Sequence, residues 1–451
     1  MPATAIDSAI FRDIFGTEAM RQVWSDGSRI QKYLDFEAAL ARAQAKLKII
    51  PQEACDEIVK HCKVEQFDIE KLKKETERIG YPVLPVVAQL VRLCKGGLGE
   101  WCHWGATTQD ITDTATVLQI RESLAIIEQD INAISDSLAA LAKKYRDMPM
   151  AGRSNLQQAV PITFGYKVAT YLAAFERHKQ RLRQLKERVF VFEFGGAAGT
   201  LSSLGKQGLA VQVELAKELN LAQPEIAWHT VHDRIAEVGC FLGLVTGICN
   251  KIAYDVKLMM QTEVEEVYEP FHEGRGSSST MPQKRNPISC VYITAQTAVV
   301  RTQVMALLNA MEQDHERSTG QWEIEWIVLP EIFVLSAGCL AQTRFLVGGL
   351  QVDEKKMRAN LDITKGLIVS EAVMMGLGPS LGRQRAHDLV YDVCRKVVAT
   401  GRPLAELLAE DAEISKHMSR AELAKLCDPA NYLGQAGEMV DRVLAMRGKI
   451  P

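Results

Sequence analysis

The spacing of prolines in the middle of the chain is the feature that most constrains its fold. No proline occurs between Pro161 and Pro224, between Pro224 and Pro270, or between Pro287 and Pro330. Each gap is much longer than the mean helix of about 11–12 residues, and proline is the residue that helix interiors tolerate least. The gaps therefore leave room for unusually long helices.

Apolar residues in and before these gaps recur with the period of a helix. One stripe has alternating spacings of three and four residues and stops shortly before Pro149: Leu124, Ile127, Ile131, Ile134, Leu138, Leu141 and Tyr145. The segment from Ile235 to Met260 is apolar on nearly every side, which predicts burial inside a bundle or an oligomer. Because no run of residues alternates as a strand does, the sequence predicts an all-α fold of long packed helices.

Composition argues against several classes of partner. The 451 residues carry a net charge of -3 without a strongly basic segment, so nucleic acid is not expected to bind. The longest uncharged apolar runs, such as residues 238–250, are shorter than the roughly 20 residues that span a bilayer, and the first residues do not resemble a secretory signal. Ten scattered cysteines without a CxxC pair are typical of free thiols in a reducing cytoplasm. We expect a cytoplasmic protein without a membrane partner.

Three segments interrupt the helical pattern and are predicted to be loops: residues 98–110, 148–165 and 270–287. The third contains Gly274, Gly276 and three consecutive serines between two prolines, which is incompatible with a helix. Such a mobile loop often carries function, although a flexible connector would have the same composition. The motif that follows these glycines favours function.

The string GSSSTMPQKRNP, residues 276–287, resembles the signature GSSxMPxKxNP of the fumarase/aspartase superfamily. Two further strings resemble the other active-site stretches of that superfamily: HWGATTQDITDT, residues 103–114, and AGRSNLQQAVPITFG, residues 151–165. The similarity extends over nearly the whole chain from about Trp24, and includes FGGAAGTLSSLG, residues 194–205, and QDHERSTGQWEIEW, residues 313–326. Within the superfamily it is greatest to the 3-carboxy-cis,cis-muconate cycloisomerase family, with the adenylosuccinate lyases more distant.

The resemblance implies three helical domains and a homotetramer. The expected domains are an N-terminal one at 1–108, a central long-helix bundle at 109–350 that carries the loop 274–287, and a C-terminal one at 351–451. Four subunits would share one helical core, and each active site would collect segments from three chains. The helix that is apolar on every side agrees with self-association, because it needs partners on every side.

The resemblance also implies a chemistry in which a proton is removed from a carbon next to a carboxylate. The resulting aci-carboxylate needs preorganised donors, and the proton needs a base within hydrogen-bond reach. The base of the family corresponds to Ser279, whose oxyanion would be stabilised by backbone N–H groups, by Lys284 and by loop closure. Lys284 and Asn286 would bind the substrate carboxylate, and Ser278 and Met281 of the same loop are further substrate-binding candidates.

The other two stretches supply further candidates. Thr107 and Thr108 correspond to carboxylate donors, although they would also cap a helix that begins near Gln109. His103 is a candidate catalytic residue, with a packed loop histidine as the alternative. Arg317 would add a bidentate clamp on a carboxylate.

The remaining substrate-binding candidates are Ser154, Asn155, Gln158, His232 and His315. His229 and His232 are three residues apart, a spacing that would suit a metal. No third ligand accompanies them, and the chemistry implied by the resemblance needs no metal. We therefore expect neither a metal nor another cofactor.

The second stretch departs from the superfamily in a way that bears on the reaction. Where the lyases have a Thr-His pair, this chain has Ser154–Asn155, and Gln158 stands in place of a second histidine. Asparagine neither takes up nor gives a proton near neutral pH, so the usual acid for a leaving group is missing. Another residue such as His103, His232 or His315 supplies the proton, or the substrate needs no acid, or the carbanion is reprotonated on its other face.

These alternatives leave three functions open. The leading interpretation is a lyase that eliminates a C–N or C–O leaving group from a small polycarboxylate to give a fumarate-type product. The second is an isomerase on the same scaffold, either a 3-carboxy-cis,cis-muconate cycloisomerase or an epimerase of an N-substituted aspartate such as iminodisuccinate. The third, a non-catalytic structural protein like a lens crystallin, is disfavoured by the intact Ser279, Lys284 and Asn286.

Overall fold

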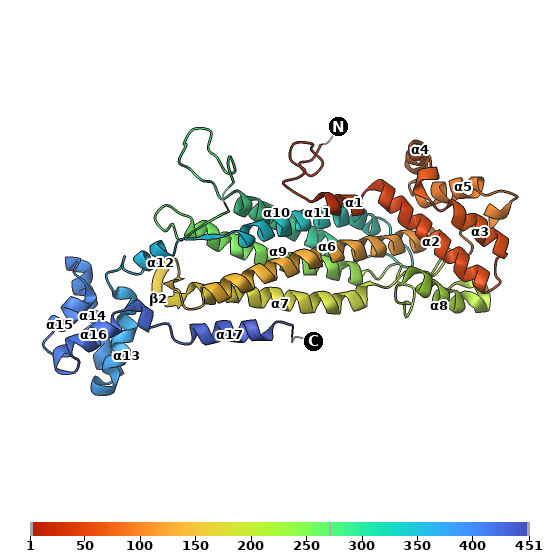
Figure 1. Cartoon of the computed structure of the whole chain (residues 1–451). Coiled ribbons are helices and arrows are strands. Elements are labelled where there is room, and N and C mark those ends of the chain that lie inside the picture. Colours follow the sequence, from red (N-terminus) through yellow and green to blue (C-terminus); the bar gives the residue numbers. More distant parts are fainter. Residues whose placement is uncertain (1–2, 271, 449–451) are drawn as a thin grey trace. The chain divides into compact units, whose positions relative to one another are not determined.

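The structure, a computed structural model, describes residues 3–270 and 272–448. These residues form 17 α-helices and two small two-stranded sheets (Figure 1). They fall into two compact units. Unit 1 comprises Met1–Asp130, Arg181–Gly247 and Ala295–Ala341, and unit 2 comprises Ile131–Gln180, Ile248–Thr294 and Gln342–Pro451. The prediction of a mainly helical protein is confirmed.

Five long helices each contribute residues to both units: α6 (Thr108–Lys144), α7 (Phe164–Val189), α9 (Asp233–Met259), α10 (Ile288–Asn309) and α11 (Gln321–Gly348). Among these five, only α11 contains a proline, Pro330. The predicted apolar stripe lies on α6, where Leu124, Ile127, Ile131 and Ile134 are fully buried. The stripe therefore locates the 37 residues of α6 and the face of that helix that packs inward.

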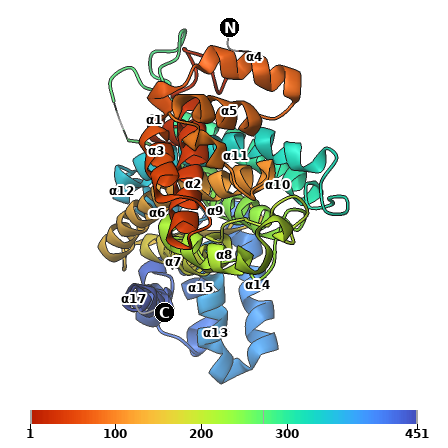
Figure 2. The same cartoon turned by 90° about the vertical axis from the view of Figure 1, so that its right-hand side faces the viewer.

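Unit 1 also contains the shorter helices α1 (Glu18–Val23), α2 (Asp26–Lys46), α3 (Gln52–His61), α4 (Ile69–Ile79), α5 (Val83–Leu93) and α8 (Gly208–Leu219), with 3-10 turns η1 (Val64–Gln66), η2 (Leu98–Trp101) and η3 (Ser202–Gln207). Helix α2 packs against α3 and α8, and Figure 2 shows α2 and α3 side by side. The start of α2 is set by Ser25, whose side chain accepts the N–H of Ser28, as an N-cap serine does.

Unit 2 contains α12 (Glu354–Asn360), α13 (Ser370–Leu381), α14 (Arg383–Thr400), α15 (Leu404–Glu410), α16 (Arg420–Leu426) and α17 (Ala436–Met446), with 3-10 turns η4 (Leu367–Val369), η5 (Ile414–Lys416) and η6 (Pro429–Asn431). Helices α13 to α16 enclose an apolar cluster that includes Val373, Val393, Leu404 and Ile414, each fully buried. A short sheet pairs β3 (Val267–Tyr268) with β4 (Gln351–Val352).

Residues 148–165, for which the sequence predicts a loop, form a β-hairpin, so that prediction is wrong. Strands β1 (Pro149–Ser154) and β2 (Gln157–Thr163) are antiparallel, with a bulge between Ala151 and Arg153. The two turn residues, Asn155 and Leu156, have φ of 50° and 63°. The hairpin could not be recognised from the sequence, because two-residue turns of this kind usually carry glycine at their second position, where this chain has leucine.

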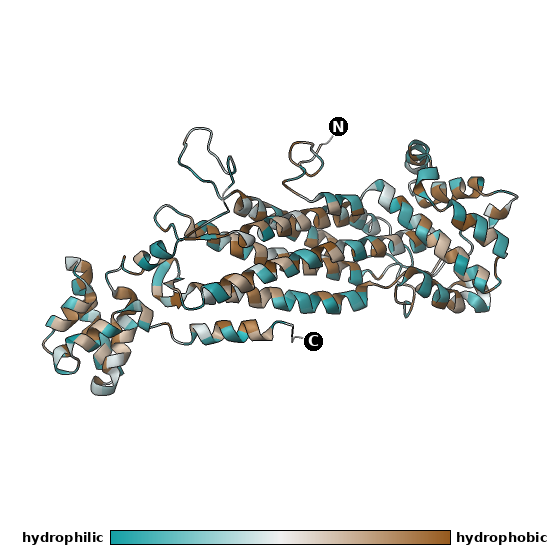
Figure 3. Ribbon diagram, in the orientation of Figure 1, coloured by the Kyte–Doolittle hydropathy of each residue, from teal (hydrophilic) through white to brown (hydrophobic). Residues whose placement is uncertain are grey.

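By length and composition alone, helices α9 and α11 are long and apolar enough to cross a membrane. Both helices are longer than the uncharged runs on which the sequence prediction was based, because they include a few charged residues. Hydrophobic residues are frequent along both helices (Figure 3). Of their most apolar windows, 56% and 67% of the residues are buried inside the protein. Core helices of a bundle have the same composition, so the two helices are weak support for a membrane span.

Candidate active site

The first turn of α6 carries the two threonines of the first active-site stretch. The helix begins at Thr108, one residue before the predicted start. Asp110 caps this end, because its carboxylate accepts the backbone N–H of Thr107 at 2.9 Å. Within residues 3–270 and 272–448, the Thr107 and Thr108 hydroxyls make no hydrogen bond. Two uncommitted hydroxyls at the positive end of a helix suit a carboxylate ligand.

Asp110 also joins this turn to two other segments. Its buried carboxylate accepts the N–H groups of Gly195 at 2.8 Å and Gly196 at 3.0 Å. Its Oδ1 lies 2.7 Å from Nε2 of His229. Any side chain at position 195 would be excluded, because a Cβ there would lie 2.7 Å from the Cβ of Ala227. One carboxylate therefore holds together the α6 turn, a glycine-rich segment and a histidine.

Glu193 is a second buried carboxyl group beside this histidine. Its Oε2 accepts the N–H of Trp228 at 2.5 Å, and its Oε1 lies 3.5 Å from Nε2 of His229. Burial, the largest influence, raises the pKa of the Glu193 carboxyl to about 9. The hydrogen bond from Trp228 works against it, and the negative charges of Asp110 and Asp113 add to it. Glu193 is therefore protonated at neutral pH.

Asp110, Glu193 and His229 present ligand atoms that all lie within 4.8 Å of one another, a grouping that can hold a metal ion. The sequence offers no sign of it, because the three residues are distant along the chain. The contact between Asp110 and His229 is a hydrogen bond at 2.7 Å, and the Asp110 oxygens also accept three backbone N–H groups. The three side chains are thus arranged to share protons through hydrogen bonds. A cation bound by Asp110 would have to displace the N–H groups that its carboxylate accepts.

His103, a candidate catalytic residue, is held by Glu37 of α2. The Glu37 carboxylate accepts the His103 backbone N–H at 3.0 Å and lies 2.8 Å from Nδ1 of its ring. Burial alone would lower the pKa of His103, but the charge of Glu37, the hydrogen bond to it and the charge of Asp110 outweigh burial and raise it. The imidazole is 23% exposed while Glu37 is 1% exposed, so a ring with a raised pKa is partly exposed on unit 1.

His232, a candidate substrate-binding residue, is enclosed within unit 1. Its ring is 1% exposed, and Nδ1 lies 2.8 Å from Glu325 while Nε2 lies 3.5 Å from Asp113. Burial lowers the pKa of His232, but the charges of Glu325 and Asp113 outweigh it and raise the pKa well above the usual value. Asp113 also accepts the indole N–H of Trp322 at 2.8 Å. The imidazolium, on the residue just before α9, joins α6 to α11 and presents no free ring nitrogen.

Arg317 reaches the α6 turn. Its guanidinium donates to Oε1 of Gln109, the residue after Thr108, at 2.5 Å and to the carbonyl of Ala197 at 2.8 Å. His315 is exposed, has a left-handed φ of 40°, and accepts a hydrogen bond on its carbonyl. Unit 1 therefore brings Arg317 and the two threonines to one helix end.

The β1–β2 hairpin carries the candidates Ser154, Asn155 and Gln158. Ser154 and Asn155 are exposed at its tip. The side-chain N–H of Gln158 donates to the carbonyl of Asn360 at 2.7 Å. Arg153 forms a bidentate ion pair with the fully buried Glu266 at 2.8 and 2.6 Å. The tip therefore presents neutral groups next to an arginine whose charge is already matched.

The signature loop lies in unit 2 and projects from the start of α10 (Figure 1). It is closed at its base by a bridge between Ser277 and Arg285 and by the Asn286 amide, which donates to the Gly276 carbonyl at 2.9 Å. Gly276 has a φ of 72°, and a Cβ there would lie 2.6 Å from the Asn286 carbonyl. Only glycine fits this close approach.

The reactive part of the loop is exposed. Ser278 makes a local turn in which its hydroxyl accepts the N–H groups of Thr280 and Met281, at 3.3 and 3.1 Å. Ser279, Met281 and Lys284 are exposed. The Ser279 hydroxyl makes no hydrogen bond within the described parts of the chain.

Several buried carboxylates position these segments and were absent from the sequence prediction. Glu37, Glu193 and Glu266 have been described, and Glu269 accepts the N–H groups of Ser289 and Cys290 at the start of α10, at 3.0 and 2.8 Å. Each is 5% exposed or less. A signal existed for Glu37 and Glu193, since both stand within apolar strings, LDFEAALA and VFVFEFGG.

Comparison with known proteins agrees with this architecture. The family model described as Lyase matches residues 12–302, and the one described as Adenylosuccinate lyase C-terminus matches residues 366–443. The solved fumarate lyase of Mesorhizobium sp. BNC1 is 48% identical, with a TM-score of 0.90 over 96% of this chain and 99% of that one. The chain therefore belongs to the fumarase/aspartase superfamily and is an enzyme of the lyase type.

Two curated relatives differ in their named activities. "Trans-aconitate decarboxylase 1" of Mycosarcoma maydis is 59% identical over 99% of this chain and 90% of its own length. The 3-carboxy-cis,cis-muconate cycloisomerase of Pseudomonas aeruginosa is 46% identical over 97% of this chain and 96% of its own length. Membership of the superfamily is thus shown, but relatives at this degree of identity are named for different reactions.

Proposed function

We propose that this enzyme decarboxylates a small unsaturated tricarboxylate, with trans-aconitate as the first candidate. The observation that carries the proposal is the neutral hairpin tip, Ser154–Asn155 with Gln158, where superfamily lyases hold a histidine. An amine or water must be protonated as it leaves, whereas carbon dioxide leaves without a proton. The 59% identity to a relative named for this reaction supports the same conclusion.

The reaction can use the aci-carboxylate chemistry of the superfamily. The C–C bond to the carboxylate on the CH2 group breaks. Its electron pair moves through the double bond onto the carboxylate attached to the CH carbon, called here the conjugated carboxylate. Carbon dioxide leaves, and a dienediolate with an extra negative charge remains. One proton then adds to the carbon next to that carboxylate, which gives 2-methylidenesuccinate. The trianion plus one proton thus becomes a dianion plus carbon dioxide.

The candidate residues divide these tasks. Thr107, Thr108 and Arg317 hold one carboxylate at the α6 end, where aligned N–H groups favour an anion. Lys284 and the second N–H of the Asn286 amide would bind the conjugated carboxylate and stabilise its developing charge.

Proton delivery falls to the signature loop. Ser279 delivers the proton to carbon, the reverse of the abstraction inferred from sequence, and closure of its loop excludes water. His103, whose pKa is raised by Glu37, would resupply the proton that each turnover consumes.

A second candidate is elimination, with Ser279 as the base that removes a proton next to a carboxylate and forms the aci-carboxylate. The complete signature with Ser279, Lys284 and Asn286 favours it, and an N-acetyl-S-(2-succino)cysteine lyase of Dickeya dadantii is 38% identical over 98% of this chain. Isomerisation, as a muconate cycloisomerase or an epimerase, would use the same base and carboxylate clamp.

We further propose that the enzyme is a cytoplasmic homotetramer with active sites assembled from several subunits. Helix α10 exposes Val291, Val299, Met305 and Leu308, each at least 38% exposed, which is an unusual amount of apolar surface for one helix. All ten cysteines are free, which agrees with a reducing compartment.

Proton NMR in D2O with trans-aconitate tests the proposal. Decarboxylation predicts 2-methylidenesuccinate with one deuterium in its CH2 next to the carboxylate. Ser279→Ala should abolish turnover with an unchanged circular dichroism spectrum, while Ser277→Ala, in the same exposed loop, should retain it. Absence of product from trans-aconitate, together with fumarate from N- or S-substituted succinates, would replace decarboxylation by elimination.

A further inference from the structure

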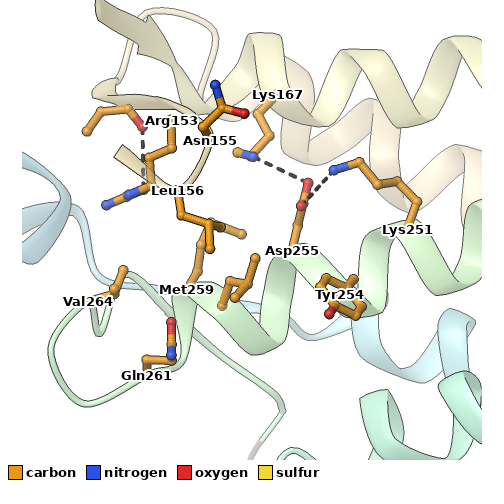
Figure 4. A pocket seen from close by; sticks show the side chains of 12 residues that line it. Arg153, Asn155, Leu156, Lys167, Lys251, Tyr254, Asp255, Met259, Gln261 and Val264 are labelled. Atoms are coloured by element: carbon orange, nitrogen blue, oxygen red, sulfur yellow. Dashed lines mark hydrogen bonds and ion pairs between the residues drawn. The ribbon is translucent and has the colours of Figure 1, made fainter. Parts of the chain in front are cut away.

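A cavity of about 490 Å3 lies in unit 2 beside the hairpin tip. Its walls are the tip, α7 and the C-terminal end of α9 (Figure 4). Ligand sites for small molecules have volumes of about 300–1,000 Å3. The cavity includes Asn155 but extends well beyond the residues to which a role has been given.

The charged groups of the cavity do not balance. Lys167 of α7 and Lys251 of α9 both pair with Asp255, at 3.3 and 2.7 Å, and Figure 4 shows them reaching the same carboxylate from two sides. The remaining cation, Arg153, is matched by Glu266. Three cations against two carboxylates leave one positive charge, which would attract an anion.

Asp255 is held in its charged form, so its negative charge is already included in this count and one positive charge remains. Burial would raise the pKa of its carboxyl, but the charge of Lys167, hydrogen bonds from Lys251 and Tyr171 and the charge of Lys251 outweigh burial and lower it. The Tyr171 hydroxyl donates to the same carboxylate. Because two ammonium groups and a hydroxyl share one carboxylate, each ammonium has N–H groups left for another acceptor.

Leu156 forms the apolar side of the cavity at two evident costs. It holds a left-handed φ of 63°, which a leucine adopts only with strain, and the residue is 79% exposed. Figure 4 shows this side chain between the hairpin and α9, and Leu258, Met259 and Val264 line the same cavity. Strained residues of this kind cluster at ligand sites, where the surroundings enforce them.

We propose that this cavity binds a small polycarboxylate, with Lys167 and Lys251 holding one carboxylate group and Leu156 covering the carbon skeleton. The ligand class rests on the proposed polycarboxylate function. The ligand is either the substrate, which would place a carboxylate here while it reaches Asn155, or a second molecule of similar chemistry that acts as an effector.

Calorimetric titration with propane-1,2,3-tricarboxylate, a saturated compound that cannot react, tests the site without turnover. Lys167→Gln and Lys251→Gln should each weaken its binding about tenfold or more, the usual loss for one charge-assisted hydrogen bond. Lys186→Gln is the matched control, because Lys186 lies on the same helix as Lys167, pairs with Glu128 at 2.6 Å and has similar exposure, 27% against 24%. It should bind as the wild type does.

Leu156→Gly provides a second variant that cannot fail by disrupting the turn, because glycine accepts the left-handed conformation. It should fold at least as stably and bind the probe several-fold more weakly. Unchanged binding in Leu156→Gly and in both lysine variants, or no binding to the wild type, would overturn the proposal. A changed oligomeric state with unchanged affinity in Leu156→Gly would instead make Leu156 an interface residue.

Kinetics separate the two sources of ligand. A substrate subsite predicts competitive inhibition by the probe and a raised KM in the lysine variants with little change in kcat. An effector site predicts inhibition or activation that is not competitive and is lost in the same variants. The wild type could fail to decarboxylate trans-aconitate and still bind the probe, with weaker binding in Lys167→Gln and Lys251→Gln. The proposed reaction would then be wrong, while the proposed binding site would be supported.

Discussion

Replacing Glu193 by glutamine should make the protein more stable at alkaline pH, by an amount that grows with pH. The pKa of Glu193 is about 9 in the folded protein against a usual value of 4.5. An acid whose pKa is raised by folding binds its proton more tightly in the folded state. Its contribution to stability is therefore complete below pH 4.5 and is lost as the pH rises to about 9.

The magnitude follows from the pKa difference. Within this window each pH unit removes about 1.4 kcal/mol of the free energy of unfolding, so the change from pH 6 to pH 8 costs about 2.7 kcal/mol. Glutamine cannot ionise, and its carbonyl can still accept the N–H of Trp228. The difference in free energy of unfolding between Glu193→Gln and wild type should therefore grow by about 2.7 kcal/mol between these two pH values, in favour of the variant.

Urea unfolding at pH 6 and pH 8, at fixed protein concentration and followed by circular dichroism, measures this difference. Glu187→Gln, an exposed change on α7, is the control and should show no dependence on pH beyond that of the wild type. The same difference between Glu193→Gln and wild type at both pH values would show that Glu193 is ionised in the folded protein and would refute the reasoning.

Three further predictions concern the candidate site. Glu37→Gln should lower the pKa of His103, since the charge that raises it is removed, and NMR titration of the His103 ring would show no downward shift if another group were responsible. Gly276→Ala should reduce turnover far more than Gly274→Ala, because a Cβ at 276 collides with the backbone while position 274 is open; equal losses would mean that only their shared positive φ matters. Asn155→His should not increase the native rate, since the site is organised for a leaving group that needs no proton, and a large gain in elimination measured by fumarate absorbance would contradict this.

Much of the scaffold could be predicted because helices of this length record their packing in local periodicity. The stripe on α6 and the start of α6 at Thr108 follow from residues close together in sequence. The hairpin at 149–163 did not follow, since its turn holds Leu156 where a glycine would mark it. The division into domains at 108 and 350 stays a prediction.

The candidate motif positions could be chosen from the sequence, whereas the buried residues that hold them in place could not. Motif positions such as Ser279 and Thr108 could be taken from strings of adjacent residues. The pairing of Asp110 with His229, or of Arg153 with Glu266, joins residues 119 and 113 positions apart, and no pattern within one string can reveal such a partner. The roles of the motif residues themselves stay predictions until variants are measured.

The substrate role proposed for the hairpin tip also bears on how such an enzyme changes its substrate over time. Asp110 satisfies four donors at once, so nearly any replacement there would leave buried N–H groups unpaired. At the tip, by contrast, Ser154 and Asn155 are exposed, and a new side chain there disturbs no core. Selection can therefore act on one short turn while the proton-sharing interior is inherited unchanged. A mutant library confined to Ser154 and Asn155 would explore new acids as substrates without exchanging Gln158, which is bonded to Asn360.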